Sequence, residues 1–159
     1  MNTTNKVDMH LKGTNVIRNP EFREQLTHWK HPLTVVADKD REELFDYVYF
    51  DSAAFIEQKF TGLDAGLEAW IWIGTKHISP EATTPLRGDA TIDFFDAANN
   101  KLDSIIFTYI ALPTWGLAFT SFTVPAEADR GTLHIAGPTD MPADSWLGIN
   151  KVDLYSATK

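Results

Sequence analysis

The sequence predicts an all-β protein, folded as one antiparallel β-sandwich or barrel. About nine or ten short apolar segments, rich in β-branched and aromatic residues, recur at regular spacing along the chain. Gly, Pro, Asn and Asp separate these segments, which leaves little room for helix. A length of 159 residues fits a single domain large enough to bury a core without disulfides.

The expected strands follow one another along the chain. The first, Asn15–Arg18, ends at a turn formed by Asn and Pro. The second, Leu33–Ala37, leads into the charged run Asp38–Glu43, for which Asp38 as an N-cap predicts one or two helical turns. The other expected strands are Tyr47–Phe50, Ala53–Phe60, Leu67–Gly74, Ala90–Asp96, Leu102–Ala111, Leu117–Val124, Thr132–Ala136 and Trp146–Tyr155.

The domain boundaries follow from the same pattern. We expect a flexible N-terminal segment over residues 1–14, the domain over residues 15–155 and a short tail over residues 156–159. The N-terminus contains no apolar run of the kind that a secretion signal needs, and no stretch is long enough to span a bilayer. A chain kept in the cytoplasm, exported without a signal or trimmed for study would fit these features.

Composition excludes several classes of function. The net charge is −8, and no Lys/Arg cluster occurs, which argues against nucleic acid and anionic membranes as partners. The absence of cysteine excludes disulfides, zinc–thiolate sites and thiol catalysis. The five histidines are scattered, and neither a G-x-S-x-G motif nor a phosphate-binding glycine loop occurs. We therefore expect a non-catalytic protein.

Three groups of residues occur in a characteristic order. The first is NVIRNPEF at residues 15–22, followed by Trp29. The second is FIEQKF at residues 55–60, followed by Gly66 and WIW at 70–72. The third is Trp115, then FTVPA at 122–126, LHI at 133–135 and INKVDL at 149–154. This order resembles the galactose-binding-like jelly rolls, especially the carbohydrate-binding modules of families four, nine and twenty-two found beside xylanases and glucanases.

The resemblance spans most of residues 15–155 and implies both a fold and a role. The implied fold is an antiparallel β-sandwich with jelly-roll topology. The implied role is non-catalytic and lectin-like: recognition of a glycan by aromatic stacking and hydrogen bonds. The landmark aromatic residues of the pattern are expected to pack in the interior: Phe22, Trp29, Trp115, Phe122 and Trp146.

The resemblance also raises the question of a structural calcium ion. Such modules usually hold one with the Glu after the first Phe and the Asp of the closing strand, and these positions correspond here to Arg23 and Asn150. A cation in place of a carboxylate disfavours a site that needs several oxygen donors. Glu21 and Asp153, with Asn150, remain the candidate calcium ligands.

The segment Leu67–Gly74 contains the main candidate binding residues. Alternation places Trp70 and Trp72 on one face of this strand. By the resemblance, the other face points into the core, so both indoles stand on the outer face of a sheet. Exposed indoles need a cover. Three covers remain open: a sugar ring, a loop of the same chain or a second protein.

Alternation also groups further candidate ligand-binding residues. Tyr47 shares a face with Tyr49, and Asp93 and Phe95 share the outward face of their strand. Tyr109 shares a face with Phe107, but periodicity does not say which face of that strand points outward. The alternative to a carbohydrate-binding protein is a structural or protein-interaction subunit of a bacterial assembly such as a toxin, tail fibre or secretion complex. A weaker third alternative is a hydrolase built on this fold.

Overall fold

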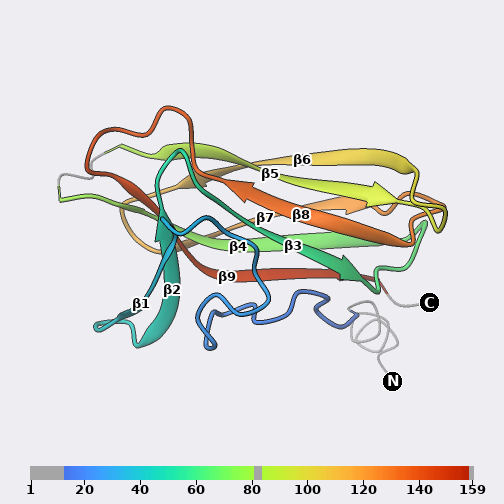
Figure 1. The fold of residues 1–159 in the computed structure, drawn as a ribbon, viewed down its shortest axis with the longest axis horizontal. Coiled ribbons are helices and arrows are strands. Elements are labelled where there is room, and N and C mark those ends of the chain that lie inside the picture. Colours follow the sequence, from blue (N-terminus) through green and yellow to red (C-terminus); the bar gives the residue numbers. More distant parts are fainter. Residues whose placement is uncertain (1–12, 81–83, 158–159) are drawn as a thin grey trace, which may run out of the picture.

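The computed structural model describes residues 13–80 and 84–157, and it contains nine β-strands in two antiparallel sheets (Figure 1). The strands are β1 (Val36–Asp40), β2 (Phe45–Phe50), β3 (Phe55–Thr61), β4 (Glu68–Ile78), β5 (Leu86–Phe95), β6 (Lys101–Ala111), β7 (Gly116–Thr123), β8 (Arg130–Ala136) and β9 (Trp146–Ser156). Most of the expected terminal segments, residues 1–14 and 156–159, lies outside the described residues. Within the described ranges, no helix is long and apolar enough to cross a membrane.

The two sheets pack face to face as a sandwich. One has five strands in the order β1-β2-β9-β4-β7, and the other has four in the order β3-β8-β5-β6. The β1–β2 hairpin projects at one end of the sandwich (Figure 1). This arrangement confirms the predicted antiparallel sandwich.

The core lies between the sheets and follows the two-residue period of the strands. On β4, Ala69, Ile71 and Ile73 are fully buried, and on β5, Ile92 and Phe94 face them from the other sheet. Because successive side chains of a strand point to opposite faces, the residues between these positions stand on the outer faces of the sandwich. Both strands have hydrogen-bonded neighbours on each side, which holds this alternation in register.

The expected first strand, Asn15–Arg18, is not a strand. The segment runs beside β9, where the N–H of Val16 donates to the carbonyl of Leu154 at 2.8 Å. The Asn15 side chain takes the place of a backbone hydrogen-bond acceptor on a neighbouring strand, because its Oδ1 accepts the N–H of Leu154 at 2.9 Å. Phe22 and Trp29 follow in the interior with their rings 5.5 Å apart, which confirms the expectation for these two landmarks.

The charged run Asp38–Glu43 is not helical, contrary to the prediction. Its first three residues belong to β1, which pairs antiparallel with β2. Oδ1 of Asp40, rather than Asp38, then accepts the N–H groups of Glu42 and Glu43 at 2.9 Å each. Asp40 therefore closes a hairpin turn, because strand pairing offers the backbone more hydrogen bonds than one isolated helical turn.

The strand β4 is longer than predicted because it continues through polar residues. Thr75 and His77 are buried although neither is apolar. The imidazole of His77 contacts the carbonyl of Thr84 through Nδ1 at 2.6 Å and the hydroxyl of Ser145 through Nε2 at 3.0 Å. These partners satisfy a buried polar ring, so the strand does not need an apolar residue there.

Truncation in the core tests the assignment of the inward face. Ile71→Ala should lower the free energy of unfolding by roughly 2–5 kcal/mol, because it leaves a cavity between the sheets. Leu33→Ala is the matched control, since Leu33 is 97% exposed and its truncation should change stability by less than about 0.5 kcal/mol. Urea denaturation measures both; equal effects would contradict the described core.

Candidate functional site

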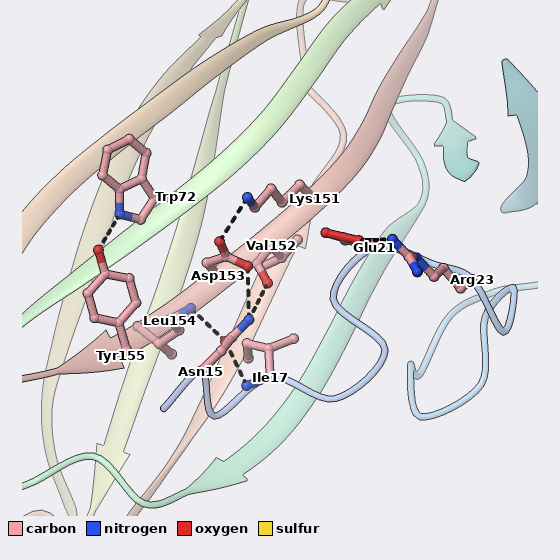
Figure 2. Close-up of polar contacts among 10 residues, drawn as sticks. All are labelled: Asn15, Ile17, Glu21, Arg23, Trp72, Lys151, Val152, Asp153, Leu154 and Tyr155. Atoms are coloured by element: carbon pink, nitrogen blue, oxygen red, sulfur yellow. Dashed lines mark hydrogen bonds and ion pairs between the residues drawn. The ribbon is translucent and has the colours of Figure 1, made fainter. Parts of the chain in front are cut away.

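Four aromatic side chains gather on the outer face of the five-stranded sheet, and we call them the indole cluster: Trp70, Trp72, Phe119 and Tyr155. Cross-strand pairing places Tyr155 opposite Trp70, and Phe119 opposite Trp72. The first pair stacks with ring centroids 5.6 Å apart, and the second with centroids 4.5 Å apart and planes 20° from parallel. The indole N–H of Trp72 donates to the hydroxyl of Tyr155 at 2.9 Å (Figure 2).

These contacts show how the two indoles are covered. The rings of neighbouring strands flank them, and both indoles remain half-buried. Phe119 keeps 60% of its surface exposed, because β7 is an edge strand with nothing beyond it among the described residues. The cluster therefore presents aromatic surface to solvent in a fixed arrangement.

Charged groups lie beside the indole cluster on the same face. Asp153 of β9 is opposite Trp72 in the strand pairing. Its carboxylate accepts a hydrogen bond from the Asn15 amide at 2.9 Å and forms an ion pair with Lys151 at 3.3 Å (Figure 2). A carboxylate and an ammonium group, both able to form hydrogen bonds, therefore lie next to an apolar ring surface.

A second group of aromatic residues occupies the other end of this face, and we call it the β2 cluster: Phe45, Tyr47, Tyr49, Trp115 and Trp146. Trp115 packs edge-on against Phe45 at 5.1 Å and against Tyr47 at 5.3 Å. The rings of Tyr49 and Trp146 are arranged edge to face, with their centroids 6.2 Å apart. The expectation of interior packing is therefore wrong for Trp115 and Trp146, which are half-buried on the outer face. Phe122, the fifth landmark, is partly buried against the core.

Sequence reasoning missed Trp115 because it comes from a loop rather than a strand. Its ring lies over Gly148 of β9, where an added Cβ would come within 2.9 Å of the ring. Nζ of Lys76 lies 5.8 Å from the ring centroid, a cation–π arrangement. The sequence feature that could have indicated this contact is Gly148, because a glycine at an outward-facing position of a strand leaves room for a ring from elsewhere in the chain.

The pKa values of two residues at the β2 cluster are shifted. The pKa of Asp40 lies below its usual value, mainly because the N–H of Glu43 donates to the carboxylate and also because Nε1 of Trp115 donates to it at 3.0 Å. The pKa of Tyr47 is raised, first by burial and then by the negative charges of Asp38 and Asp40. Tyr47 therefore stays a neutral hydroxyl at neutral pH.

The two clusters are separated along β4. Trp72 and Lys76 are four residues apart on β4, which corresponds to roughly 13 Å along a strand. Between them Gly74 carries no side chain, and Asn150 of β9 occupies the space that a Cβ would need. A cavity of about 460 Å³ opens beside this region, lined by Glu21, Arg23, Leu44, Phe45, Asp46, Asn150 and Lys151. The face can therefore accept an elongated ligand with contacts at both ends.

Three sequence-predicted site residues do not join this face. Tyr109 is buried between the sheets, where its hydroxyl donates to the carbonyl of Ala136 at 3.1 Å and burial raises its pKa. The inward face of β6 is therefore the one that contains Tyr109, which makes it a core residue. Asp93 and Phe95 point outward, but from β5, on the opposite side of the sandwich. Asp93 there accepts a hydrogen bond from Ser104 at 2.6 Å.

The candidate calcium ligands do not form a suitable donor set. Glu21 is paired with Arg23 at 3.1 Å, and Asp153 is paired with Lys151 (Figure 2). Oδ1 of Asn150 is buried without a hydrogen-bond partner, but it faces the backbone at Gly74. No group of three or more His, Asp or Glu side chains that could hold a metal ion occurs in residues 13–80 and 84–157. These residues do not fit a hard divalent cation.

Chelation tests this conclusion. We expect EDTA to leave the melting temperature unchanged, because the carboxylates are already neutralised by cationic side chains. A site saturated at a hundredfold excess over its Kd would contribute about 2.7 kcal/mol, which calorimetry resolves easily. A lower melting temperature in EDTA that excess Ca²⁺ restores would show that an ion binds after all.

Acid titration tests the contact between Asp40 and Trp115. The folded pKa of Asp40 lies below the unfolded one, so its contribution to stability is present above the unfolded value and is lost as the pH falls through the folded value. We expect the indole N–H resonance of Trp115 to shift with a midpoint below pH 3.8. Asp40→Asn should abolish this titration, and a midpoint above 3.8 would contradict the contact.

Comparisons with known proteins agree with the fold. No protein-family model and no curated protein sequence matches the chain. Among solved structures, the enzymatically active domain of tailspike protein 4 from bacteriophage CBA120 is similar, at 16% identity and a TM-score of 0.69. The match covers 91% of this chain and 21% of the tailspike chain.

Isolated carbohydrate-binding modules are similar over nearly their whole length. A family 61 module, solved in complex with β-1,4-galactotriose, is 16% identical with a TM-score of 0.59 over 91% of this chain and 99% of the module. A xylan-binding family 22 module from Paenibacillus barcinonensis is 11% identical with a TM-score of 0.61 over 92% and 99%. The chain therefore has the jelly-roll β-sandwich fold of carbohydrate-binding modules, as its sequence motifs predicted.

Proposed function

We propose that this protein is non-catalytic and binds a carbohydrate on the outer face of its five-stranded sheet. The observation on which this rests is the indole cluster, in which Trp70, Trp72 and Phe119 are partly exposed on an open face beside charged groups, over a buried Tyr155. The C–H groups of a sugar ring pack against aromatic carbon, while its hydroxyls need hydrogen-bond partners at the ring margin. Phe119 supplies the most exposed aromatic surface, and Asp153 and Lys151 supply polar partners.

The rigidity of the cluster supports this proposal. Each indole is held by a stacked neighbour, and Trp72 is also held by its hydrogen bond to Tyr155. A ligand therefore meets rings that are already ordered, so little conformational entropy is lost at the protein surface on binding. Lys151 and Asp153 are likewise placed by their ion pair and by Asn15.

The separation of the two aromatic clusters favours an oligosaccharide over a single sugar. One monosaccharide cannot contact both Trp72 and Trp115, because roughly 13 Å of strand lies between the positions of Trp72 and Lys76. The modules of similar fold provide matching precedents: one is solved with a galactotriose, and another is described as xylan-binding. Their binding of oligosaccharide and xylan supports a binding role here.

The first test compares two phenylalanines on opposite faces. Phe119→Ala should weaken the binding of an oligosaccharide, whereas Phe95→Ala, on the other sheet, should leave it unchanged. Loss of a stacking contact of about 0.5–1.5 kcal/mol together with its apolar area predicts at least a tenfold rise in Kd. Titration calorimetry with β-1,4-galactotriose and xylohexaose, followed by a glycan array, measures the effect. Equal affinities for the two variants would place the ligand elsewhere.

The second test separates a binding role of the indoles from a packing role. Trp70→Ala and Trp72→Ala should raise the Kd at least tenfold while the protein remains folded. If the indoles serve mainly as core, each change should instead cost about 3–5 kcal/mol of stability. A double variant with native affinity and a greatly lowered melting temperature would end the proposal. Absence of any glycan ligand for the native chain would favour the alternative of an assembly subunit.

A further inference from the structure

The longest uncharged part of the chain coincides with two neighbouring strands. No Asp, Glu, Lys or Arg occurs from Ser104 to Ala126, a run of 23 residues in a chain of which 23% is charged. This run includes most of β6, the whole connection to β7 and all of β7. The run therefore lies on two strands that contact each other rather than on scattered segments. Charged side chains flank the run on the β6 side, because Arg87 and Asp89 of β5 are opposite Ile110 and Thr108.

These two strands form the lateral edge of the sandwich, which we call the β6/β7 edge (residues 104–123). β6 is the last strand of the four-stranded sheet, and β7 is the last strand of the five-stranded sheet. The two strands contact each other, and β6 follows the upper border of the molecule in Figure 1. Both sheets thus end on the same side of the protein.

Apolar side chains are unusually exposed along this edge. The described residues contain eight exposed large hydrophobic side chains, and five of them lie here: Ile106, Ile110, Leu112, Leu117 and Phe119. Ile106 is 68% exposed and Leu117 is 58% exposed. Clustered apolar residues on one surface indicate contact with another molecule more often than scattered ones do.

The backbone of β7 is also open on its outer side. It pairs with β4 from Gly116 to Thr123 without a bulge, and none of these residues makes any other hydrogen bond among the described ones. Other edge strands are protected: β1 carries Asp38, Lys39 and Asp40, and Lys30 exchanges two backbone hydrogen bonds with Glu57 on β3. An uncharged, regular edge without such protection pairs readily with another strand.

We propose that two copies of this chain associate through the β6/β7 edge, with β7 pairing antiparallel to β7 of the second copy. A net charge of −8 makes two copies repel each other over most of their surfaces, so they can approach closely only where charge is absent. A strand that pairs antiparallel with itself forms a two-fold symmetric interface, the commonest symmetry of protein dimers. The second copy is therefore the occupant that fits both the charge and the strand geometry.

The geometry of β7 also predicts which residues meet. Directly opposite residues in an antiparallel pair lie on the same face of the sheet. Pairing centred on Phe119 places the phenyl rings of both copies side by side on the outer face. Trp72 stacks on Phe119 within each copy, so the row of aromatic rings would continue from one protomer into the other. The dimer would then carry one continuous ten-stranded sheet.

A matched pair of leucine variants tests the proposal. Sedimentation equilibrium should give the native chain twice its 17.9 kDa monomer mass. Leu117→Lys should raise the dimer dissociation constant at least tenfold, because pairing centred on Phe119 places residue 117 opposite Ser121 of the second copy, where the new charge would be desolvated without a partner. Leu33→Lys, which alters the most exposed leucine outside the edge, should leave the dimer intact.

A variant on β6 and two further measurements show whether a weaker dimer results from the changed edge or from misfolding. Ile110→Lys on β6 should also weaken the dimer, and circular dichroism should show native spectra for all three variants. Hydrogen exchange at the β7 amides should slow as the protein concentration rises, while the β1 amides should be unaffected. A native chain that stays monomeric at millimolar concentration, or a dimer insensitive to both edge variants, would overturn the proposal.

Discussion

The strict alternation of β4 between core and solvent is the constraint on which the rest of the structure depends. Ala69, Ile71 and Ile73 are fully buried, so Trp70 and Trp72 have no position except the outer face. A shift of one residue in pairing would bury two indoles and expose three apolar side chains. The hydrogen-bonded neighbours β9 and β7 exclude that shift, and they also deliver the rings that flank the indoles.

Contacts between strands and one loop residue, Trp115, order the outer face. Stacking of Trp70 on Tyr155 and of Trp72 on Phe119 joins three strands in one aromatic surface. At the other end of the face, the loop residue Trp115 is held by Asp40 and by the space above Gly148. Aromatic side chains that could pack in a core are thus displayed on a surface.

Charge is distributed unevenly around the sandwich, and this unevenness separates two kinds of surface. The outer face of the five-stranded sheet combines rings with Lys76, Lys151 and Asp153, so it offers hydrogen bonds together with apolar contact. The β6/β7 edge offers apolar side chains and free backbone groups, and its own residues carry no charge. The first combination suits a polar ligand with apolar patches, such as a sugar. The second combination suits pairing with a β-strand of another molecule. Phe119 belongs to both surfaces, which couples the proposed binding face to the proposed dimer.

The sequence by itself determined most of the strands and which residues share a face of each strand, whereas the inward face of residues 67–74 was predicted from the family resemblance. The sequence predicted nearly every strand and the placement of Trp70 and Trp72 opposite Ile71, because periodicity and turn residues are local signals. It also predicted the jelly-roll fold from the order of its motifs, through their resemblance to carbohydrate-binding modules. It did not determine which face of β6 points inward, since both faces are apolar there; only the packed sheets show that Tyr109 is core. Nor did it determine that Asp93 and Phe95 lie on the opposite side from Trp72, or that Trp115 joins Tyr47. Those relations depend on the order of strands in each sheet and on loop positions, which are set by contacts between residues far apart in the chain.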